Sequence, residues 1–189
     1  MSLCTDHLPD LRPRYCMGVG YAEDLVVCSA LGVDMYDCVF PTRTARFGTA
    51  LTMRGSLPLR NTKFARDFGK IEEGCECFTC LNHSRSYVNL LFQSKETVGC
   101  HLISIHNIAF QMRLMRQIRQ AIMDGKFPDW IRSWMFGYFK NRYPGSKPVG
   151  QGLEENHENN GEKRRMEEWE NGYPMWIVNA LGSVNVRLI

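Results

Sequence analysis

The chain has 189 residues, the length of one ordinary domain. Its net charge at pH 7 is only +3, so the overall charge does not by itself indicate nucleic-acid binding. No apolar run reaches the length needed to cross a bilayer, and the first residues lack the basic start and apolar stretch of a secretory signal. The eight cysteines therefore favour a reducing compartment, where thiols serve as metal ligands or core residues.

The first predicted elements form a strand–helix–strand unit. Residues 14–17 read as a short strand that leads into a glycine turn, residues 18–20, where glycine permits positive φ and close approach of a ligand. Residues 22–31 have the apolar pattern of a buried amphipathic helix that ends at a glycine. Residues 33–36 form a second short strand, and the intervening helix predicts that the two strands are parallel.

Asp37 stands at the end of this second strand, so we expect it beside the glycine turn, residues 18–20. Pro41 breaks the strand because proline has no N–H for a strand ladder. We expect a basic loop to follow, with Arg43 and Arg46 three residues apart. A carboxylate beside two arginines suits chemistry on an anionic sugar-phosphate. The alternative is an aspartate that caps the next turn and two solvated arginines.

The next two segments are a hairpin and a second basic loop. Residues 50–53 and 56–59 have the pattern of two short antiparallel strands. Residues 61–69 form a polar loop whose charges are solvated or, in the sharper interpretation, face RNA. The basic residues of this region are Arg60, Lys63 and Arg66.

A metal-ligand pattern follows. Cys75, Cys77 and Cys80 form a Cys-x-Cys-x-x-Cys cluster, and histidines lie downstream at His101 and His106. Zn²⁺ prefers thiolate and imidazole ligands in a tetrahedral array, and three cysteines with one histidine fill all four positions. Such a closed set leaves no position for water, so the metal would be structural. The alternatives are a disulfide or free thiols, and both the close Cys-x-Cys spacing and the reducing compartment argue against a disulfide.

Three helices are predicted beyond the cysteines, over residues 83–92 with Ser84 at or near the cap, 97–123 and 129–139. Apolar residues of the long middle helix recur at three and four positions, at Val98, Leu102, Ile105, Ala109, Met112, Met115, Ile118 and Ile122. A basic row on the opposite face is interpreted as solvated, and consists of Arg113, Arg116 and Arg119. The last helix would pack on the long one through Trp130, Ile131, Trp134, Met135 and Tyr138.

The end of the chain changes character. Residues 141–172 are rich in Gly, Asn, Glu, Lys and Arg and poor in large apolar residues, which predicts disorder or a solvated loop. Residues 174–189 regain apolar residues and could dock as a terminal helix.

Two long motifs resemble one enzyme family. Residues 14–21 (Arg-Tyr-Cys-Met-Gly-Val-Gly-Tyr) and residues 32–48 look like the C-terminal half of tRNA-guanine transglycosylase, the queuine tRNA-ribosyltransferase family. The Asp-Cys-Val-Phe-Pro-Thr-Arg run that begins at Asp37 most resembles the eukaryotic catalytic subunit, and the accessory subunit departs from that run. The cysteine cluster also matches the family's metal set, and the match selects His106 over His101 as the fourth ligand.

The resemblance covers roughly residues 3–139 and implies an α/β fold, the C-terminal part of a (β/α)₈ TIM barrel with a zinc-binding insertion and C-terminal helices. Because such a barrel needs about 200 to 250 residues, we expect a chain truncated at the N-terminus. The organisation then has four parts. They are the last barrel strands and helices with the active-site loop (1–69), the zinc-binding subdomain and helices (70–139), a polar insertion (140–172) and a C-terminal helix (173–189).

The resemblance further implies a chemistry. Asp37 would be the nucleophile that attacks C1′ of the guanosine at the anticodon wobble position, and queuine would replace guanine through a covalent aspartyl-ribosyl intermediate. Met17 would pack on the base and Gly18 would contact it through the backbone. Arg43 and Arg46 would hold the anticodon loop. The family's second active-site aspartate would lie upstream of this chain, so we expect the chain alone to be inactive in the exchange of guanine.

The implied partners are tRNA with a GUN anticodon, queuine, a structural Zn²⁺ ion and the accessory subunit in a heterodimer. The implied location is the cytoplasm, with association with the mitochondrial outer membrane as a further option. The alternative hypothesis is a non-catalytic, zinc-stabilised module for tRNA binding or dimerisation. An intact motif around Asp37 favours the enzyme, because a non-catalytic subunit has no reason to keep it.

Overall fold

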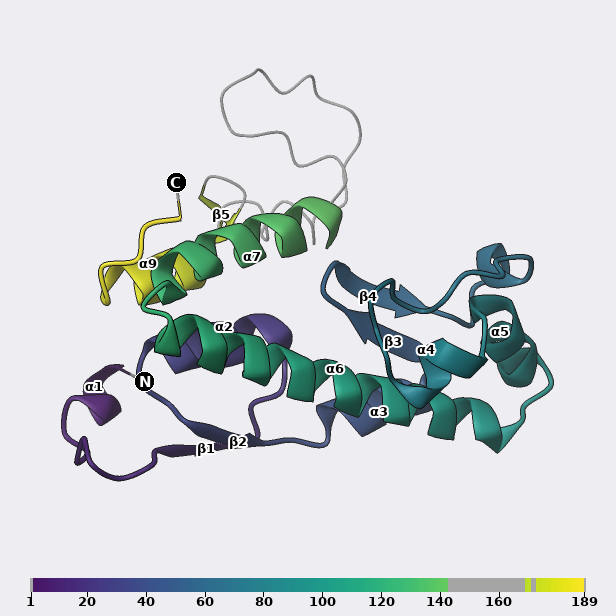
Figure 1. Cartoon of the computed structure of the whole chain (residues 1–189), viewed down its shortest axis with the longest axis horizontal. Coiled ribbons are helices and arrows are strands. Elements are labelled where there is room, and N and C mark those ends of the chain that lie inside the picture. The colour runs from purple at the N-terminus through teal and green to yellow at the C-terminus, as the bar shows by residue number, and fades with distance from the viewer. Residues whose placement is uncertain (1, 143–168, 171–172, 189) are drawn as a thin grey trace, which may run out of the picture.

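The computed structural model describes residues 2–142, 169–170 and 173–188. One long helix, α6 (Thr97–Met123), runs across most of the molecule and carries the other elements on both of its ends (Figure 1). The described strands form three two-stranded sheets among the helices, so the chain has the expected α/β character. None of the helices in this described part combines the length and the apolar composition that a membrane crossing requires.

The predicted strand–helix–strand unit is confirmed. β1 (Tyr15–Met17) and β2 (Met35–Asp37) pair in parallel, and α2 (Ala22–Ala30) forms the crossover between them. The register places Met17 opposite Asp37, so both strands end at the same edge. β2 begins two residues later than predicted, because the backbone N–H groups of Asp34 and Met35 first turn towards the carbonyl oxygen of Arg14.

The basic loop predicted after β2 is wrong, because a helix, α3 (Phe40–Arg46), occupies this position. Pro41 lies in its first turn and is buried. The missing N–H of a proline is harmless there, since the first N–H groups of a helix have no partner within the helix. The backbone N–H of Arg43 closes the first turn on the carbonyl oxygen of Val39, at 2.8 Å. Arg43 and Arg46 therefore stand on a helix that follows Asp37 directly.

The predicted hairpin is present as β3 (Thr49–Thr52) and β4 (Gly55–Pro58), which pair antiparallel. The second basic loop contains a short 3₁₀ helix, η1 (Thr62–Phe64). The helix predicted with its cap at Ser84 is confirmed as α5 (Arg85–Gln93), because the Ser84 hydroxyl accepts a hydrogen bond from the N–H of Tyr87 at 3.2 Å.

The bounds of α6 match the prediction, but its predicted buried face is wrong. Half of the apolar positions counted for that face are more than 40% exposed, namely Val98, Ile105, Met112 and Ile122. The buried face is instead made of Gly99, Leu102, Ile103, His106, Asn107, Phe110, Leu114, Ile118 and Ala121. Counting apolar residues shifts the face because His106 and Asn107 are polar and fully buried. The basic row is also not a uniformly solvated face, since Arg113 is partly buried against Glu72.

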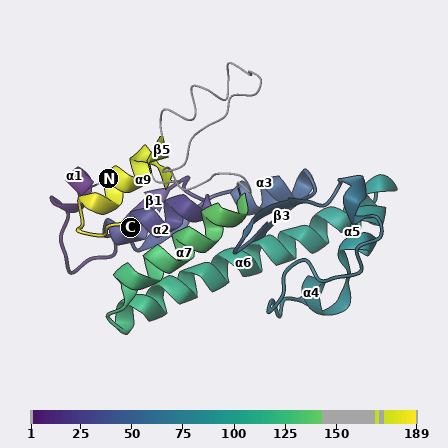
Figure 2. The same ribbon diagram turned by 90° about the horizontal axis from the view of Figure 1, so that it is seen from above.

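Two hydrophobic clusters lie towards the two ends of α6, and Figures 1 and 2 show the helices and strands gathered around these ends. The first joins α2 and α6 to α7 (Phe127–Arg142) and α9 (Met175–Gly182), and the five predicted contact residues of α7 belong to it or pack against it. The second lies beneath the hairpin, α5 and α4 (Phe78–Asn82). The molecule therefore has a strand–helix–strand end and a cysteine-cluster end, linked by one helix.

The terminal segments are described only in part. α7 runs to Arg142, beyond the predicted end at residue 139, and most of the polar segment 140–172 lies outside the described residues. Within it, β5 (Trp169–Glu170) pairs with β6 (Tyr173–Pro174). The predicted terminal helix is shorter than expected, spanning Met175–Gly182, with Ile177 and Leu181 buried. At the other terminus, α1 (Ser2–Thr5) precedes β1.

Candidate active site and metal centre

Asp37 lies at the carboxyl end of β2, immediately beside Gly18 at the end of β1. The backbone N–H of Gly18 donates to the carbonyl oxygen of Asp37 at 2.8 Å and to its Oδ1 at 3.2 Å. Gly18 has φ of +81°, a conformation that other residues adopt only with strain. The carboxylate of Asp37 and the side chain of Met17 are exposed. The structure thus brings together the predicted nucleophile and the two predicted base contacts.

Tyr15 is a further member of this site that the sequence reasoning missed. Its hydroxyl lies close to the carboxylate of Asp37, and the interaction with this carboxylate is the main reason that the pKa of Tyr15 is raised. Strand alternation could have found it, because Tyr15 and Met17 are two residues apart and share the exposed face of β1. The same face of β2 carries Met35 and Asp37.

The opposite face of the two strands packs on α2. The hydroxyl of Tyr36 lies 3.0 Å from the hydroxyl of Ser29 and donates to the carbonyl oxygen of Val33 at 3.2 Å. Burial is the main reason that the pKa of Tyr36 is raised. This anchored inner face fixes β2, so the exposed carboxylate of Asp37 stands on a rigid support.

Arg43 and Arg46 occupy the last turn of α3 and are exposed. Neither side chain forms an ion pair within the described ranges, and none of the hydrogen bonds found there joins either one to Asp37. The neighbouring Arg60 is better held, since its guanidinium stacks 5.1 Å from the ring centre of Phe92 and donates to the carbonyl oxygen of Arg46. The two arginines of α3 therefore remain available for an anionic ligand.

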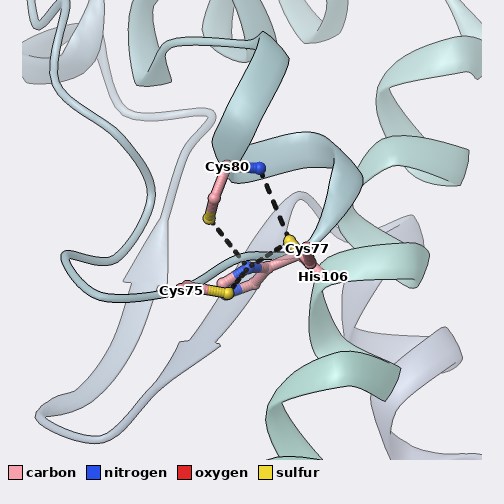
Figure 3. A group of neighbouring side chains, drawn as sticks. All are labelled: Cys75, Cys77, Cys80 and His106. Atoms are coloured by element: carbon pink, nitrogen blue, oxygen red, sulfur yellow. Dashed lines mark hydrogen bonds between the residues drawn. The ribbon is translucent and has the colours of Figure 1, made fainter.

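The four predicted metal ligands converge, as Figure 3 shows. The ligand atoms of Cys75, Cys77, Cys80 and His106 all lie within 4.8 Å of one another. Nδ1 of His106 is 3.8, 3.5 and 3.3 Å from the three sulfur atoms in that order. Cys77 caps α4 and Cys80 lies within it, whereas His106 comes from the middle of α6. The alternative His101 is exposed on the same helix.

The chemistry of this cluster fits a bound metal. Nε2 of His106 donates to the carbonyl oxygen of Leu51 at 2.8 Å, which leaves the lone pair of Nδ1 directed at the sulfur atoms. Burial lowers the pKa of His106 and so favours the neutral imidazole that binds metals. Burial raises the pKa of Cys80 to about 12, so its thiolate needs a nearby cation. All eight cysteines are free, in agreement with the prediction against a disulfide.

A salt bridge adjoins the cluster. The guanidinium of Arg113 pairs with Glu72 and lies close to the sulfur of Cys75. Burial opposes the charge of Arg113, but Glu72 and Cys75 outweigh it, so the pKa of Arg113 is raised. The other carboxylate oxygen of Glu72 accepts the N–H of Met53 at 2.6 Å. The chain therefore supplies its own positive charge beside the thiols. Three cysteines and a histidine close a tetrahedral shell and suit a structural zinc ion.

Comparison with known proteins bears on this arrangement. The family model described as queuine tRNA-ribosyltransferase matches residues 1–140. The queuine tRNA-ribosyltransferase catalytic subunit of Schizosaccharomyces pombe is 46% identical over 193 residues, covering 98% of this chain and 41% of that protein. The catalytic subunit of Caenorhabditis elegans is 49% identical over 140 residues, covering 74% of this chain and 35% of that protein.

A bacterial relative gives a similar result. The queuine tRNA-ribosyltransferase of Bacillus thuringiensis is 44% identical over 142 residues, covering 75% of this chain and 38% of that protein. The chain thus spans about two fifths of the length of the curated relatives it matches. Its matched region contains the site around Asp37 and the whole metal-ligand set. The chain belongs to the queuine tRNA-ribosyltransferase family.

Proposed function

We propose that this chain contributes the nucleophile to a tRNA-guanine transglycosylase, a pentosyltransferase that exchanges guanine at the anticodon wobble position for queuine. The observation that carries the proposal is the placement of Asp37. Its carboxylate is exposed at the end of a parallel strand and accepts a hydrogen bond from the N–H of Gly18, with the hydroxyl of Tyr15 close by. Active sites of parallel α/β folds lie at this end of the strands.

The reaction proceeds in two displacements. An oxygen of Asp37 attacks C1′ of the ribose, the bond from C1′ to N9 of guanine breaks, and guanine leaves with the electron pair and takes up a proton. N9 of queuine then attacks C1′, the aspartyl ester bond breaks, and queuine gives up a proton. The exchange is balanced, and the carboxylate is regenerated.

The residues around Asp37 take the supporting roles. The target nucleotide must leave its stack to expose C1′. In the proposal the exposed side chain of Met17, beside Asp37 in the sheet, packs on the flipped base, and the backbone of Gly18 contacts it. The exposed guanidinium groups of Arg43 and Arg46 bind phosphates of the anticodon loop. A zinc ion in the Cys₃His site would stabilise the fold and takes no part in the chemistry.

The proposal extends to the larger assembly. The β1–α2–β2 unit is the repeating unit of a (β/α)₈ barrel, which supports that architecture for the whole protein. The resemblance supports the accessory subunit as a heterodimer partner, tRNA with a GUN anticodon as substrate, and a cytoplasmic location with association with the mitochondrial outer membrane.

The test is covalent trapping. The chain, alone and with the accessory subunit, is incubated with anticodon stem-loop RNA and a competing base, and mass spectrometry is used to look for a protein–RNA adduct. The variant Asp37→Asn is tested in parallel under the same conditions. An adduct that disappears in Asp37→Asn supports the proposal, and an adduct that persists in that variant overturns Asp37 as the nucleophile.

The same experiment addresses the second candidate function, a zinc-stabilised module for RNA binding. The observation that favours it is that the metal ligands have their own hydrophobic cluster, which contains Cys75, Cys80, Ile103 and their neighbours. RNA binding with stoichiometric zinc and no adduct in any mixture would favour this module over the enzyme.

A further inference from the structure

Two amide side chains on α6 hold the segments that follow β1 and β2, which are the glycine turn after β1 and the start of helix α3 after β2. Nδ2 of Asn107 donates to the carbonyl oxygen of Pro41 at 2.9 Å, within the segment that follows Asp37. Nε2 of Gln111 donates to the carbonyl oxygen of Gly20 at 2.6 Å, within the segment that follows Met17 and Gly18. The two amides are four residues apart and therefore lie on the same face of the helix, one turn from each other.

Asn107 is fully buried and binds three further backbone or side-chain groups besides the carbonyl oxygen of Pro41. Its Oδ1 accepts the N–H of Leu51 at 2.8 Å, and its Nδ2 also donates to the carbonyl oxygen of Thr49 at 3.0 Å. It thus joins α3 to the hairpin strand β3. Nδ2 also donates to Oγ1 of Thr44 at 3.4 Å, and all its other partners are backbone groups, so Asn107 fixes the path of the chain at those points.

Asn107 also directly follows the metal ligand His106. The imidazole of His106 donates to the carbonyl oxygen of Leu51, the residue whose N–H is bound by Asn107. A metal held by the four ligands would fix His106, and with it α6, against the cysteine cluster. His106 would then hold β3 through Leu51, and Asn107 would transmit that position to α3. Gln111, one turn further along α6, would transmit it to the glycine turn.

We propose that Asn107 and Gln111, together the amide pair, are positioning residues. They set the glycine turn after β1 and the start of α3 after β2 relative to the metal site. The amide pair touches neither substrate nor Asp37, and acts through the backbone of Pro41 and Gly20. The inference rests on the proposed function for its catalytic meaning, but the loop ordering it describes is a property of the fold alone.

The first measurement is hydrogen exchange, which needs no activity. The N–H of Gly18 is bound to Asp37, so its exchange reports on the glycine turn. The N–H of Arg43 is bound to Val39, so its exchange reports on the start of α3. Gln111→Met keeps the size of the side chain and removes the donor, and the exposed Gln117→Met on the same helix is the matched control. We expect Gln111→Met to speed exchange at Gly18 about tenfold, the order expected for one lost hydrogen bond, and to leave Arg43 within twofold. Gln117→Met should change neither amide.

A second variant probes the other loop. Asn107→Ala should speed exchange at Arg43 about tenfold or more, with a smaller effect at Gly18. Because Asn107 is fully buried, this variant can lose its fold, and Gln111→Met, on a partly buried residue, then decides the matter. Exchange at Gly18 in Gln111→Met within twofold of wild type, with zinc content unchanged, overturns the proposal.

The second measurement links loop order to chemistry. In Gln111→Met the rate of adduct formation at saturating stem-loop RNA should fall about tenfold, while the RNA concentration for half-saturation stays within twofold. A variant that is merely less stable would lose zinc or unfold, and would not show this separation. If the wild type forms no adduct, the proposed function fails, and the exchange data still decide whether the amide pair orders the loops. If exchange rises at Gly18 but the adduct rate is unchanged, the positioning role is overturned.

Discussion

The N–H of Gly18 bonds to Asp37 at both its carbonyl oxygen and its carboxylate. The first bond extends the parallel pairing of β1 and β2, and the second orients the side chain. The orientation of the carboxylate of Asp37 thus depends on the backbone of a neighbouring strand. Changes that part the two loops should therefore alter the site without touching Asp37.

Gly20→Ala tests this dependence. An added Cβ would lie 2.8 Å from both Cβ and Sγ of Cys38, the residue after Asp37, so the two loops must move apart. We expect a loss of about 1–3 kcal/mol in the free energy of unfolding, measured by urea titration. Gly137→Ala is the control, because its Cβ meets open space on α7 and should stabilise the helix by about 0.5–1 kcal/mol. Equal effects of the two variants would contradict the close packing at Gly20.

Asp37→Ala should lower the pKa of Tyr15 towards its ordinary value. In the wild type the nearby carboxylate of Asp37 favours the protonated phenol, as an acceptor for its proton and through its negative charge. Removing both makes deprotonation easier, so phenolate should form at lower pH. The measurement is the alkaline titration of tyrosine absorbance, with Tyr15→Phe identifying the transition of Tyr15. An unchanged titration in Asp37→Ala would show that the two side chains do not interact.

His106→Ala should abolish stoichiometric zinc binding, whereas His101→Ala should retain it. His106 is fully buried among the three cysteines, and His101 is exposed. Structural zinc sites contribute roughly 10–16 kcal/mol of apparent binding free energy in small zinc peptides, so loss of the ligand should lower the unfolding midpoint sharply. Metal analysis and thermal unfolding measure the two effects. Loss of zinc from His101→Ala, with zinc retained in His106→Ala, would show that His101 and not His106 is the fourth ligand.

Arg113→Met should weaken zinc binding about tenfold to a hundredfold, the range found when groups that support metal ligands are removed. The positive charge of Arg113 lies close to Cys75 and balances the charge of Glu72, and methionine supplies no charge. Arg116→Met, on the exposed side of α6, should leave the affinity unchanged. Competition with a chelator gives both affinities. Arg113→Met alone leaves the carboxylate of Glu72 without its partner and should lower the folding stability. The double variant Glu72→Gln, Arg113→Met should recover part of that loss, since it leaves no unpaired carboxylate.

Replacing Arg43 and Arg46 together by alanine should weaken binding of anticodon stem-loop RNA and flatten its salt dependence. Each lost phosphate contact lowers the slope of log K against log salt by roughly 0.7–0.9. The double variant of Arg116 and Arg119 removes the same charge from an exposed face of α6 and is the control. Similar losses in both double variants would mean that overall charge, and not α3, governs RNA affinity.

The sequence was sufficient to predict the features that depend on local spacing. The strand–helix–strand unit follows from a short periodic pattern between glycines, and the three cysteine ligands follow from their close spacing. The choice of His106 over His101 came from the family resemblance. The position of Asp37 beside Gly18 could be predicted from the order of strand, helix and strand, because neighbouring parallel strands end at the same edge of a sheet.

The features that depend on distant partners could not be predicted in the same way. Pro41 was taken as a breaker because a pattern does not show whether it lies in the first turn of a helix. The buried face of α6 contains His106 and Asn107, whose partners lie at Leu51 and neighbouring residues, more than fifty positions away. Arg113 is likewise partly buried because Glu72 approaches from 41 residues earlier.

The grip of Asn107 on β3 has a consequence for how the chain can evolve. The groups it binds there, the carbonyl oxygen of Thr49 and the N–H of Leu51, belong to the backbone and exist whatever side chain stands at either position. Substitution at Thr49 should therefore leave this contact intact, whereas Leu51 is constrained separately, because its own side chain is buried in the core. Asn107 has no such freedom, because no other side chain of its length both donates and accepts as an amide does. Selection for this contact should therefore act on Asn107 and not on the side chain of Thr49.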